Sequence, residues 1–444
     1  MAQPKIIVLD DDPTGSQTVH SCLLLTRWDV DTLCTGLTDS VPIFFILTNT
    51  RALPAVEAAE VTRTVCRHLK QALALTGVSD YIVVSRSDST LRGHYPLETD
   101  VIAAELGPFD AHFLVPAFLE GGRITRNSQH VLMVEGQPVP VHETEFARDS
   151  VFGYRHSYLP EYVAEKTAGR IPAAAVERIL LPDLRSAGLA QRLARLTGNV
   201  CGVVDAETQA DLDQFAAAVL EVASGGKRFL FRSAASLLTA LAQLPPQPIP
   251  PEAMATYCRP GRRGVVLVGS HVRKTTEQLE VLLSEPDIAP IEVPVAPLKD
   301  SATAEAQIIA TVLEAVNGAV AADQTPVIFT SRQELTFADA ATRLAFGQRV
   351  SEVLMAIVQQ LPTDLRFLIS KGGITSNDVL SKGLALPTVR LLGQILPGCS
   401  VVRTGADHPR FPNLPVVLFP GMWAIAKGWP RFIIACIVQR ANYG

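Results

Sequence analysis

Three adjacent carboxylates, Asp10, Asp11 and Asp12, are the first residues of this chain whose type and spacing suit chemistry. A hydroxyl and a glycine follow closely, at Thr14 and Gly15. Adjacent carboxylates repel one another, so such a run costs stability unless a metal, an arginine or a substrate hydroxyl lies among them. Because a short apolar run leads directly into these acids, we expect them at the end of a buried strand, on the edge of an active site.

Three interpretations of this run stay open. The spacing of Asp10, Asp12 and Thr14 fits a phosphatase of the haloacid dehalogenase type, with Asp10 as nucleophile and Asp12 as general acid and base. Alternatively, Asp11 and Asp12 hold the hydroxyls of a sugar substrate, together with Thr14. The third interpretation is a helix N-cap, because Asp, Thr and Gly all cap helices well. Three acids are more than a cap needs, so a functional role is favoured.

A second polar cluster, Ser85–His94, follows the apolar run Tyr81–Val84. Within it, Arg92 is suited to grip a substrate carboxylate with two parallel hydrogen bonds, and Ser87 adds a hydroxyl. Asp88 is placed either to accept a proton from a substrate hydroxyl or to orient Arg92. The alternative is a solvated loop with a weak Arg–Asp pair. The density of polar groups directly after a strand favours a functional loop.

The third cluster lies just beyond the next strand and combines charges with glycines. Glu120, Gly122 and Arg123 belong to it. We expect Glu120 and Arg123 to help complete an acid-binding pocket, and Gly122 and Arg123 to bind the substrate. A glycine turn with an exposed ion pair explains the same residues equally well.

The second half of the chain carries polar, glycine-bearing turns in place of acids. The run Val265–Val268 leads into Gly269 and Ser270, and the run Val416–Phe419 leads into a proline and Gly421. Such a turn before a helix exposes backbone N–H groups that favour a phosphate. Each turn alone also fits a tight connection without a ligand, but several of them in one domain favour a nucleotide site.

The richest of these turns follows the apolar run Leu365–Ile369. Gly372 and Gly373 let the backbone approach a ligand closely, Thr375 offers a hydroxyl, and Lys371 is suited to neutralise phosphate charge. The chain has no Walker-A P-loop, no Rossmann glycine fingerprint and no protein-kinase motifs. A nucleotide site here would therefore use an uncommon fold.

Apolar runs that alternate with helical patterns must position these clusters. We expect strands at ten runs: Ile6–Leu9, Ile43–Leu47, Tyr81–Val84, His112–Val115, Val200–Val204, Phe229–Phe231, Val265–Val268, Val327–Phe329, Leu365–Ile369 and Val416–Phe419. The intervening helical patterns include Pro54–Leu75, Thr303–Val316 and Ala338–Gln360. This alternation predicts an α/β fold with mainly parallel sheets, whose ligands bind at the carboxyl ends of the strands.

The chain is too long for one ordinary core, and a proline-rich stretch interrupts its middle. Five prolines lie in the eight residues 244–251, a density that neither a helix nor a central strand tolerates. We therefore predict an N-terminal domain at 1–243, a linker at 244–254 and a C-terminal domain at 255–444. Two such domains would place two ligand sites around one interdomain cleft.

Composition excludes several classes of function. A net charge of −5 without a basic block argues against a nucleic-acid partner. No apolar stretch approaches the roughly 20 residues that span a bilayer, and no secretory signal pattern is present, so we expect a cytoplasmic protein. The seven cysteines show no C-x-x-C spacing, which makes zinc sites and a disulfide framework poor interpretations.

Taken in order, the motifs resemble one known family, that of the four-carbon acid sugar kinases. The resemblance covers nearly the whole chain, and the order and spacing of its motifs make it specific. These motifs are Asp11-Asp12-x-Thr14-Gly15, Asp88-Ser89-Thr90-Leu91-Arg92-Gly93, Pro116-Ala117-Phe118 with Gly122-Arg123, Gly269-Ser270, Gly372-Gly373-x-Thr375-Ser376 and Pro420-Gly421.

The resemblance implies an N-terminal α/β domain that binds a sugar acid and a C-terminal domain that binds ATP. It implies transfer of the γ-phosphate to the terminal hydroxyl of a tetronate or 3-oxo-tetronate, with Mg²⁺ bridging the phosphate oxygens. In this kinase hypothesis Arg92 holds the substrate carboxylate, and Asp12 or Asp88 orients or deprotonates the attacking hydroxyl. Asp11 would face the substrate as well.

On the nucleotide side the resemblance implies contacts near Ser270, from Gly372 through Ile374 to Thr375, and at Gly421, with Lys371 beside the triphosphate. Pro13, Ile374 and Met422 depart from the family pattern, which leaves the subfamily and the substrate open. The phosphatase and a non-catalytic sensor of sugar acid or nucleotide are the alternatives to the kinase. A homodimer is one assembly that the sequence leaves open.

Overall fold

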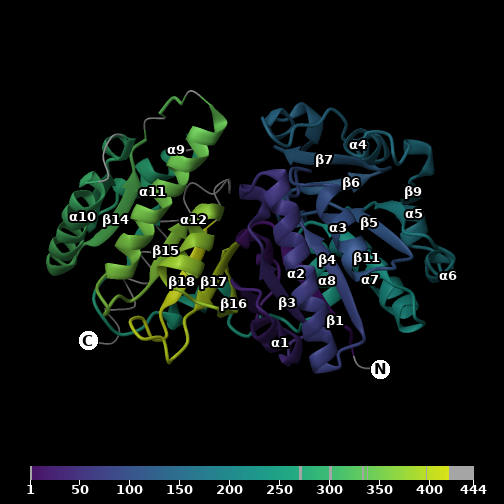
Figure 1. The fold of residues 1–444 in the computed structure, drawn as a ribbon, viewed down its shortest axis with the longest axis horizontal. Helices are drawn as coiled ribbons and strands as arrows, with labels where there is room; N and C mark the ends of the chain where they lie inside the picture. Colours follow the sequence, from purple (N-terminus) through teal and green to yellow (C-terminus); the bar gives the residue numbers. More distant parts are fainter. Residues whose placement is uncertain are drawn as a thin grey trace. The chain divides into compact units, whose positions relative to one another are not determined.

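The computed structural model describes residues 3–269, 273–299, 303–332, 335–337, 339–396 and 398–419. The chain divides into two compact units, the first ending at Pro246 and the second beginning at Gln247. In Figure 1 the first unit runs from purple to teal and the second from green to yellow. Among the residues described, no helix is both long enough and apolar enough to cross a membrane.

The first unit is built on a parallel sheet whose strand order is β2-β3-β1-β4-β11-β5-β10-β9. Its inner strands are near-continuous apolar runs, because a parallel sheet that is covered on both faces buries every side chain. The strands are β1 (Lys5–Asp10), β2 (Leu23–Leu25), β3 (Ile43–Leu47), β4 (Tyr81–Arg86), β5 (Ala111–Val115), β9 (Glu177–Ile179), β10 (Val200–Val204) and β11 (Phe229–Ser233).

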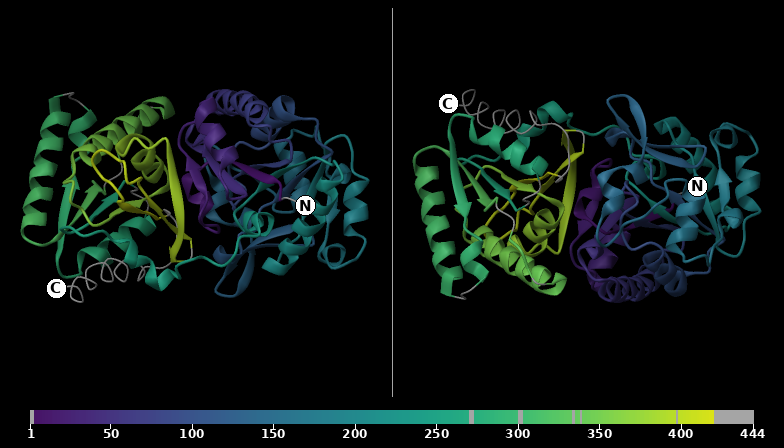
Figure 2. Two further views of the ribbon diagram at one scale, coloured as in Figure 1. Left: turned by 90° about the horizontal axis from the view of Figure 1, so that it is seen from below. Right: turned by 90° about the horizontal axis from the view of Figure 1, so that it is seen from above.

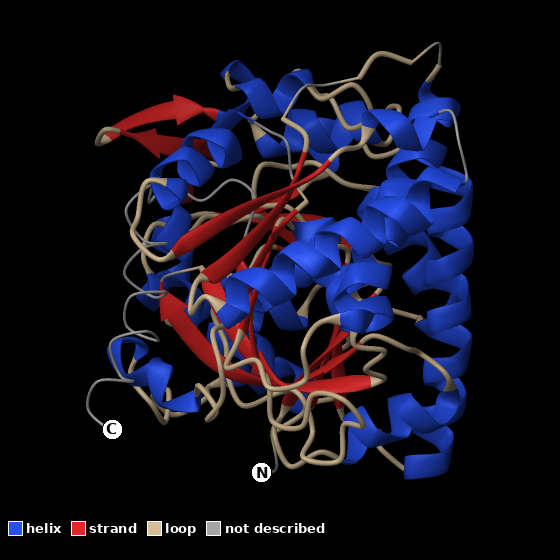
Figure 3. Ribbon diagram, turned by 90° about the vertical axis from the view of Figure 1, so that its left-hand side faces the viewer, coloured by secondary structure: helices blue, strands red, loops and turns tan. Residues whose placement is uncertain are grey.

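Helices cover both faces of this sheet. Figure 3 colours the helices of the chain blue and its strands red. On β11, Leu230 packs in the apolar cluster that includes the helices α1 to α3, whereas Phe231 lies against Phe215 of α7 on the opposite face. The helices are α1 (Val30–Thr38), α2 (Ala55–Thr76), α3 (Leu97–Leu106), α4 (Leu159–Lys166), α5 (Leu181–Leu184), α6 (Leu189–Ala194), α7 (Gln209–Ser224) and α8 (Ser236–Ala242).

A small antiparallel sheet interrupts this pattern between β5 and α4. It consists of β6 (Arg123–Arg126), β7 (Gln129–Val134) and β8 (Gln137–Pro140). None of these strands was predicted from the sequence, because they are short and mostly only partly buried, so no continuous apolar run marks them.

The second unit has the strand order β13-β14-β12-β15-β18-β17-β16, parallel from β13 to β18 and antiparallel from β18 to β16. Helix α10 packs on β13 and β14, and α11 packs on α10 (Figure 2). The strands are β12 (Val265–Val268), β13 (Ile288–Val293), β14 (Thr325–Thr330), β15 (Leu368–Lys371), β16 (Thr388–Leu396), β17 (Cys399–Arg403) and β18 (Pro415–Phe419). The helices are α9 (Arg273–Leu283), α10 (Thr303–Ala321), α11 (Ala340–Gln360) and α12 (Gly373–Asp378).

The predicted α/β class with mainly parallel sheets is confirmed, and each of the ten predicted strands overlaps a strand of the structure. The one shifted strand is β15, which begins at Leu368 and continues through Lys371. The exact domain limits and the linker stay predictions. A 3₁₀ helix at Pro251–Tyr257 begins within the predicted linker, and it buries Met254 in the core of the second unit.

Candidate active site

The acidic run and the second polar cluster reach the same edge of the first sheet. Asp10 ends β1 and is in register with Arg86, which ends β4, and Arg86 is in register with Ser233 at the end of β11. The amide of Asp11 donates a hydrogen bond to the carbonyl of Arg86 at 3.3 Å. Because the strands are parallel, their carboxyl ends bring residues that are far apart in sequence into one site.

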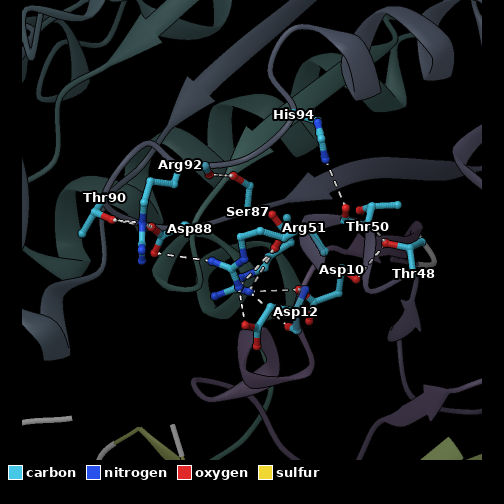
Figure 4. A network of polar contacts seen from close by, with 12 residues as sticks. Asp10, Asp12, Thr48, Thr50, Arg51, Ser87, Asp88, Thr90, Arg92 and His94 are labelled. Carbon is cyan, nitrogen blue, oxygen red and sulfur yellow. Dashed lines mark hydrogen bonds and ion pairs between the residues drawn. The ribbon is translucent and has the colours of Figure 1, made fainter. Parts of the chain in front are cut away.

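Arg51 connects the two clusters. It lies in a short 3₁₀ turn, Thr50–Ala52, directly after β3. Its guanidinium forms an ion pair with Asp12 and lies 3.7 Å from carboxylate oxygens of both Asp11 and Asp88 (Figure 4). Burial alone would lower the pKa of Arg51, but these carboxylates hold it above its ordinary value. Sequence analysis missed Arg51, although its position just after a strand end was a usable signal.

Asp10 is completely buried, and its contacts are with other residues of the fold. Its Oδ1 accepts a hydrogen bond from Arg86 at 3.1 Å. A Cβ placed on Gly15 would lie 2.4 Å from both of its carboxylate oxygens, so only glycine fits above it. Burial raises the pKa of Asp10 to about 7. A nucleophile needs access to its substrate, so this geometry gives the phosphatase hypothesis no support.

Asp11 is 2% exposed, yet neither of its carboxylate oxygens accepts a hydrogen bond from the described residues. The negative charge of Asp11 is balanced by two guanidinium groups at longer distances, Arg86 at 3.6 Å and Arg51 at 3.7 Å. Burial raises its pKa to about 6, against the opposing charge of these arginines. Buried carboxylates normally accept hydrogen bonds, so Asp11 has unused capacity for a ligand hydroxyl.

Asp88 and Arg92 form the predicted local pair. Arg92 Nε donates to Asp88 Oδ2 at 2.7 Å, and Thr90 donates to the same oxygen. Arg92 also lies 3.7 Å from Asp149 and stacks over the Phe146 ring. Burial would raise the pKa of Asp88, but the neighbouring guanidinium groups hold it well below its usual range. Asp88 is therefore a fixed negative charge and a poor proton acceptor.

The remaining predicted substrate residues lie around this network. Asp12 is the least buried of the three adjacent acids. Ser87 donates from Oγ to the carbonyl of Arg92 at 3.2 Å. The side chain of Thr14 lies outside the described residues.

Gly122 and Arg123 lie at the start of the small sheet. Gly122 has a φ of +68°, a conformation that favours glycine. Arg123 donates to the carbonyl of Gly121 at 2.8 Å and stacks over Phe118. Burial lowers its pKa against the charge of Asp88, which places Arg123 within electrostatic reach of the second cluster.

A buried ion pair supports the network from behind. Arg232 of β11 pairs with Glu98 of α3 at 2.5 Å and donates to Ser85 at 2.8 Å. A Cβ on Gly93 would lie 2.6 Å from Arg232 Nη2 and 3.1 Å from Asp11 Oδ2. Gly93 therefore allows Arg232 and Asp11 to lie close to the polar loop. The pair of Arg232 and Glu98 was not predicted from the sequence.

A small pocket opens beside these groups. Ser233, whose Oγ has no hydrogen-bond partner among the described residues, contributes to its wall. The pocket is lined by Ser87, Asp88, Leu91, Tyr95, Leu114, Pro116, Tyr162, Arg232 and Ser233. Its walls combine the charged side chains of Asp88 and Arg232 with hydroxyls and apolar side chains.

The second unit presents a different edge. Lys371 was predicted on the turn after β15, but it is the last residue of that strand and is fully buried. Its ammonium lies 4.5 Å from the centre of the Phe419 ring, and burial lowers its pKa to about 7. The prediction of its position was wrong, because the strand continues through two polar residues. Its contact with a phosphate stays a prediction.

The glycine turn itself follows directly. Gly372 has a φ of +112°, and its amide donates to the carbonyl of Phe419 at 2.9 Å. Gly373 begins α12, and Ile374 is 56% exposed. A Cβ on Gly269 would lie 2.2 Å from Thr375 Oγ1, so the two turns pack against each other.

Two further predicted nucleotide contacts, Ser270 and Gly421, lie outside the described residues. The structure therefore brings Gly372, Gly373, Ile374 and Thr375 to one turn and leaves the others untested.

Two family models match the chain in order. The model of a sugar-binding N-terminal domain matches residues 6–241, and the model of a nucleotide-binding C-terminal domain matches residues 265–423. This chain belongs to the four-carbon acid sugar kinase family. The first of these models alone covers more than half of the chain and includes the whole carboxylate–arginine network.

Two curated members of the family are similar in sequence. The chain is 28% identical over 293 residues to D-erythronate kinase of Heliobacterium modesticaldum, a match that covers 62% of this chain and 60% of that protein. It is 30% identical over 216 residues to D-threonate kinase of Bordetella bronchiseptica, over 45% of this chain and 51% of that protein. The matches thus span about half to three fifths of the relatives.

Solved structures share the fold at low identity. A protein of Salmonella typhimurium superposes with a TM-score of 0.66 at 21% identity, over 98% of this chain and 99% of that one. A protein of Haemophilus influenzae gives a TM-score of 0.59 at 18% identity, over 98% and 99%. These likenesses establish the fold of this family member.

Proposed function

We propose that this protein transfers the γ-phosphate of ATP to the terminal hydroxyl of a four-carbon sugar acid. The single observation that carries the proposal is Asp11, a buried carboxylate that accepts no hydrogen bond from the described residues and is flanked by Arg51 and Arg86. The family models of a sugar-binding and a nucleotide-binding domain support it, as do the names of the two curated relatives.

The substrate would meet acids and arginines in fixed positions. Asp11 and Asp12 accept hydrogen bonds from its hydroxyls, because ionised carboxylates are acceptors only. Arg92 binds its carboxylate, since the planar guanidinium offers several donors in one fork and Asp88 orients it at Nε. Phosphoryl transfer depends mainly on such positioning and on neutralised charge.

The proton of the attacking hydroxyl needs an acceptor. Asp88 was predicted for this role together with Asp12, but its low pKa makes it a weak base. Asp11, with a pKa of about 6, is ionised at neutral pH and is closer to the operating range of a general base. We therefore assign proton acceptance to Asp11 or Asp12 and a fixed charge to Asp88.

The nucleotide would bind along the glycine turn Gly372–Thr375. Turns with glycine leave backbone N–H groups accessible to phosphate oxygens. No cluster of three or more acidic, histidine or cysteine side chains suited to a metal occurs among the described residues. A Mg²⁺ ion that is carried by the phosphates needs few ligands from the protein. Asp12, the most accessible of the three adjacent acids, is the residue that would bind it. When bound, the ion would neutralise charge on the transferred group.

The test is a coupled assay of ADP release with a panel of four-carbon acids that includes D-erythronate and D-threonate. Turnover of at least one acid, dependent on both ATP and Mg²⁺, is the expected result. Thermal shifts with each acid and with a non-hydrolysable ATP analogue serve as the control for binding. Binding of both ligands without ADP release would refute the kinase and identify a sensor.

A further inference from the structure

Four successive backbone carbonyls of the second polar cluster each accept a hydrogen bond from a side chain. The carbonyl of Ser89 lies 2.7 Å from His130 Nε2, and that of Thr90 accepts from the Tyr154 hydroxyl at 2.6 Å. The carbonyl of Leu91 accepts from the Tyr162 hydroxyl at 2.8 Å. The fourth carbonyl, that of Arg92, accepts a hydrogen bond from Ser87 Oγ. Loops rarely have every carbonyl held by a side chain, since most turn carbonyls bond to water or to backbone.

Three of these donors come from one segment, residues 123–166, which contains the small antiparallel sheet and α4. His130 lies on β7 and is fully buried. Tyr154 precedes α4 and Tyr162 belongs to it, and both are at most 5% exposed. A buried hydroxyl or imidazole without a hydrogen bond destabilises the folded state. We therefore expect these three contacts to persist whenever the segment is folded.

The protonation state of His130 is fixed by its neighbours. The Ser89 carbonyl is an acceptor only, so Nε2 carries the proton and Nδ1 accepts from the Thr125 hydroxyl at 2.9 Å. Burial lowers the pKa of His130 to about 4, so the ring is neutral at physiological pH. The donor is thus present over the whole working range of pH.

The held loop contains backbone strain. Leu91 has a φ of +67°, a left-handed conformation that an ordinary residue adopts only when its surroundings impose it. Its side chain packs in the same apolar cluster as Tyr95, Tyr154 and Tyr162. The bend at Leu91 turns the chain between Asp88 and Arg92, so that Arg92 Nε reaches back to the carboxylate.

We propose that His130, Tyr154 and Tyr162 are positioning residues that fix the loop from Asp88 to Arg92 in the geometry that binds the sugar acid. They act through backbone carbonyls and need not touch the substrate with their donor atoms. The inference rests on the proposed function, because it assigns Asp88 and Arg92 to the substrate.

The experiment removes one hydroxyl at a time. Tyr154→Phe and Tyr162→Phe should each lower kcat/KM for the sugar acid about tenfold, the effect of one lost buried hydrogen bond, while the KM for ATP stays within about twofold. Tyr158→Phe is the matched control, because Tyr158 lies in the same segment and contacts Arg178 instead of the loop. His130→Gln should retain more activity than His130→Leu, since Gln can still donate.

A structural role alone predicts a different result. It would lower the melting temperature of the Phe variants and leave both KM values of the folded enzyme unchanged. If kcat/KM for the sugar acid in both Phe variants equals that of Tyr158→Phe within about twofold, the positioning role is refuted.

Hydrogen exchange separates this inference from the proposed function. Amides in residues 85–94 should exchange at least about tenfold faster in Tyr154→Phe than in wild type, with β1 unchanged. Unchanged exchange in the loop would refute the proposal that these side chains fix it. If the wild-type protein turns over no sugar acid, the proposed function fails, and the exchange result still decides whether these side chains hold the loop.

Discussion

The carboxyl edges of the two sheets, where we propose that the two ligands bind, carry different kinds of polar group. The edge of the first unit is crowded with charges, and Asp11, Asp12 and Asp88 surround Arg51 within 4 Å. The edge of the second unit is a glycine turn around Gly372, and its neighbouring lysine, at position 371, is buried in the strand.

The difference follows from what each proposed ligand presents. A small acid with several hydroxyls offers few atoms, so each must meet a directed side-chain partner, and water must be excluded from the ion pairs. A triphosphate offers many equivalent oxygens, which backbone amides can bind without a fixed side chain. The first edge should therefore be sensitive to charge and the second to backbone conformation.

The largest effect is expected at Asp11. Asp11→Asn keeps the shape but removes the charge that accepts a hydroxyl proton, and kcat/KM for the sugar acid should fall about 1000-fold. ADP release measured at saturating ATP tests this. Asp213→Asn, on the exposed side of α7, is the control and should match wild type. Loss of less than tenfold would remove Asp11 from the reaction.

Arg51→Lys should have the next largest effect. Lysine keeps the positive charge, but its single ammonium cannot replace the two guanidinium nitrogens that face Asp12 and Asp88. The kcat/KM for the sugar acid should therefore fall about 100-fold. Arg63→Lys changes an exposed pair on α2 and is the matched control. Equal activity of the two variants would show that Arg51 contributes charge alone.

Gly372→Ala tests the other edge. A φ of +112° strains any residue with a Cβ, so the turn should shift, and the KM for ATP should rise about tenfold. The sugar-acid KM should change by less than about twofold, which thermal shift with the acid alone can verify. Gly318→Ala, at an open position in α10, is the control. Equal weakening of both ligands would contradict the division of roles.

The smallest effect is a pH dependence. Burial raises the pKa of Asp11 to about 6, and its ionised form is the one that accepts a proton. Activity should therefore be lost as pH falls through this value, to about half at pH 6 and then about tenfold per unit below it. A profile of kcat/KM for the sugar acid tests the sign. A flat profile between pH 5 and 7 would assign the proton to another group.

Sequence analysis predicted the parallel strands well, because inner strands such as β1 and β4 are continuous apolar runs with no other interpretation. It also identified the loops that follow them. It placed Lys371 wrongly, since a polar residue after an apolar run indicates a turn, whereas here the strand continues and buries the ammonium.

The partners of the predicted acids were harder to find. Arg51 and Arg232 each follow a predicted strand, but a single arginine at a strand end does not indicate which residues it contacts. Glu98 lies in a helix, and nothing in its local pattern distinguishes it from a surface charge. Tertiary packing makes them site residues. Strand register sets Arg86 beside Asp10 and Ser233 beside Arg86, and the packing of α3 brings Glu98 to Arg232. Register in a parallel sheet depends on long-range packing and cannot be derived from local spacing.

The contacts of His130, Tyr154 and Tyr162 are made to carbonyls, and every amino acid supplies the same carbonyl. The side chain at Ser89 can therefore change without removing these contacts, whereas the hydroxyl of Thr90 also donates to Asp88. A loop that is held by its carbonyls can keep the path of its backbone while individual side chains along it are replaced.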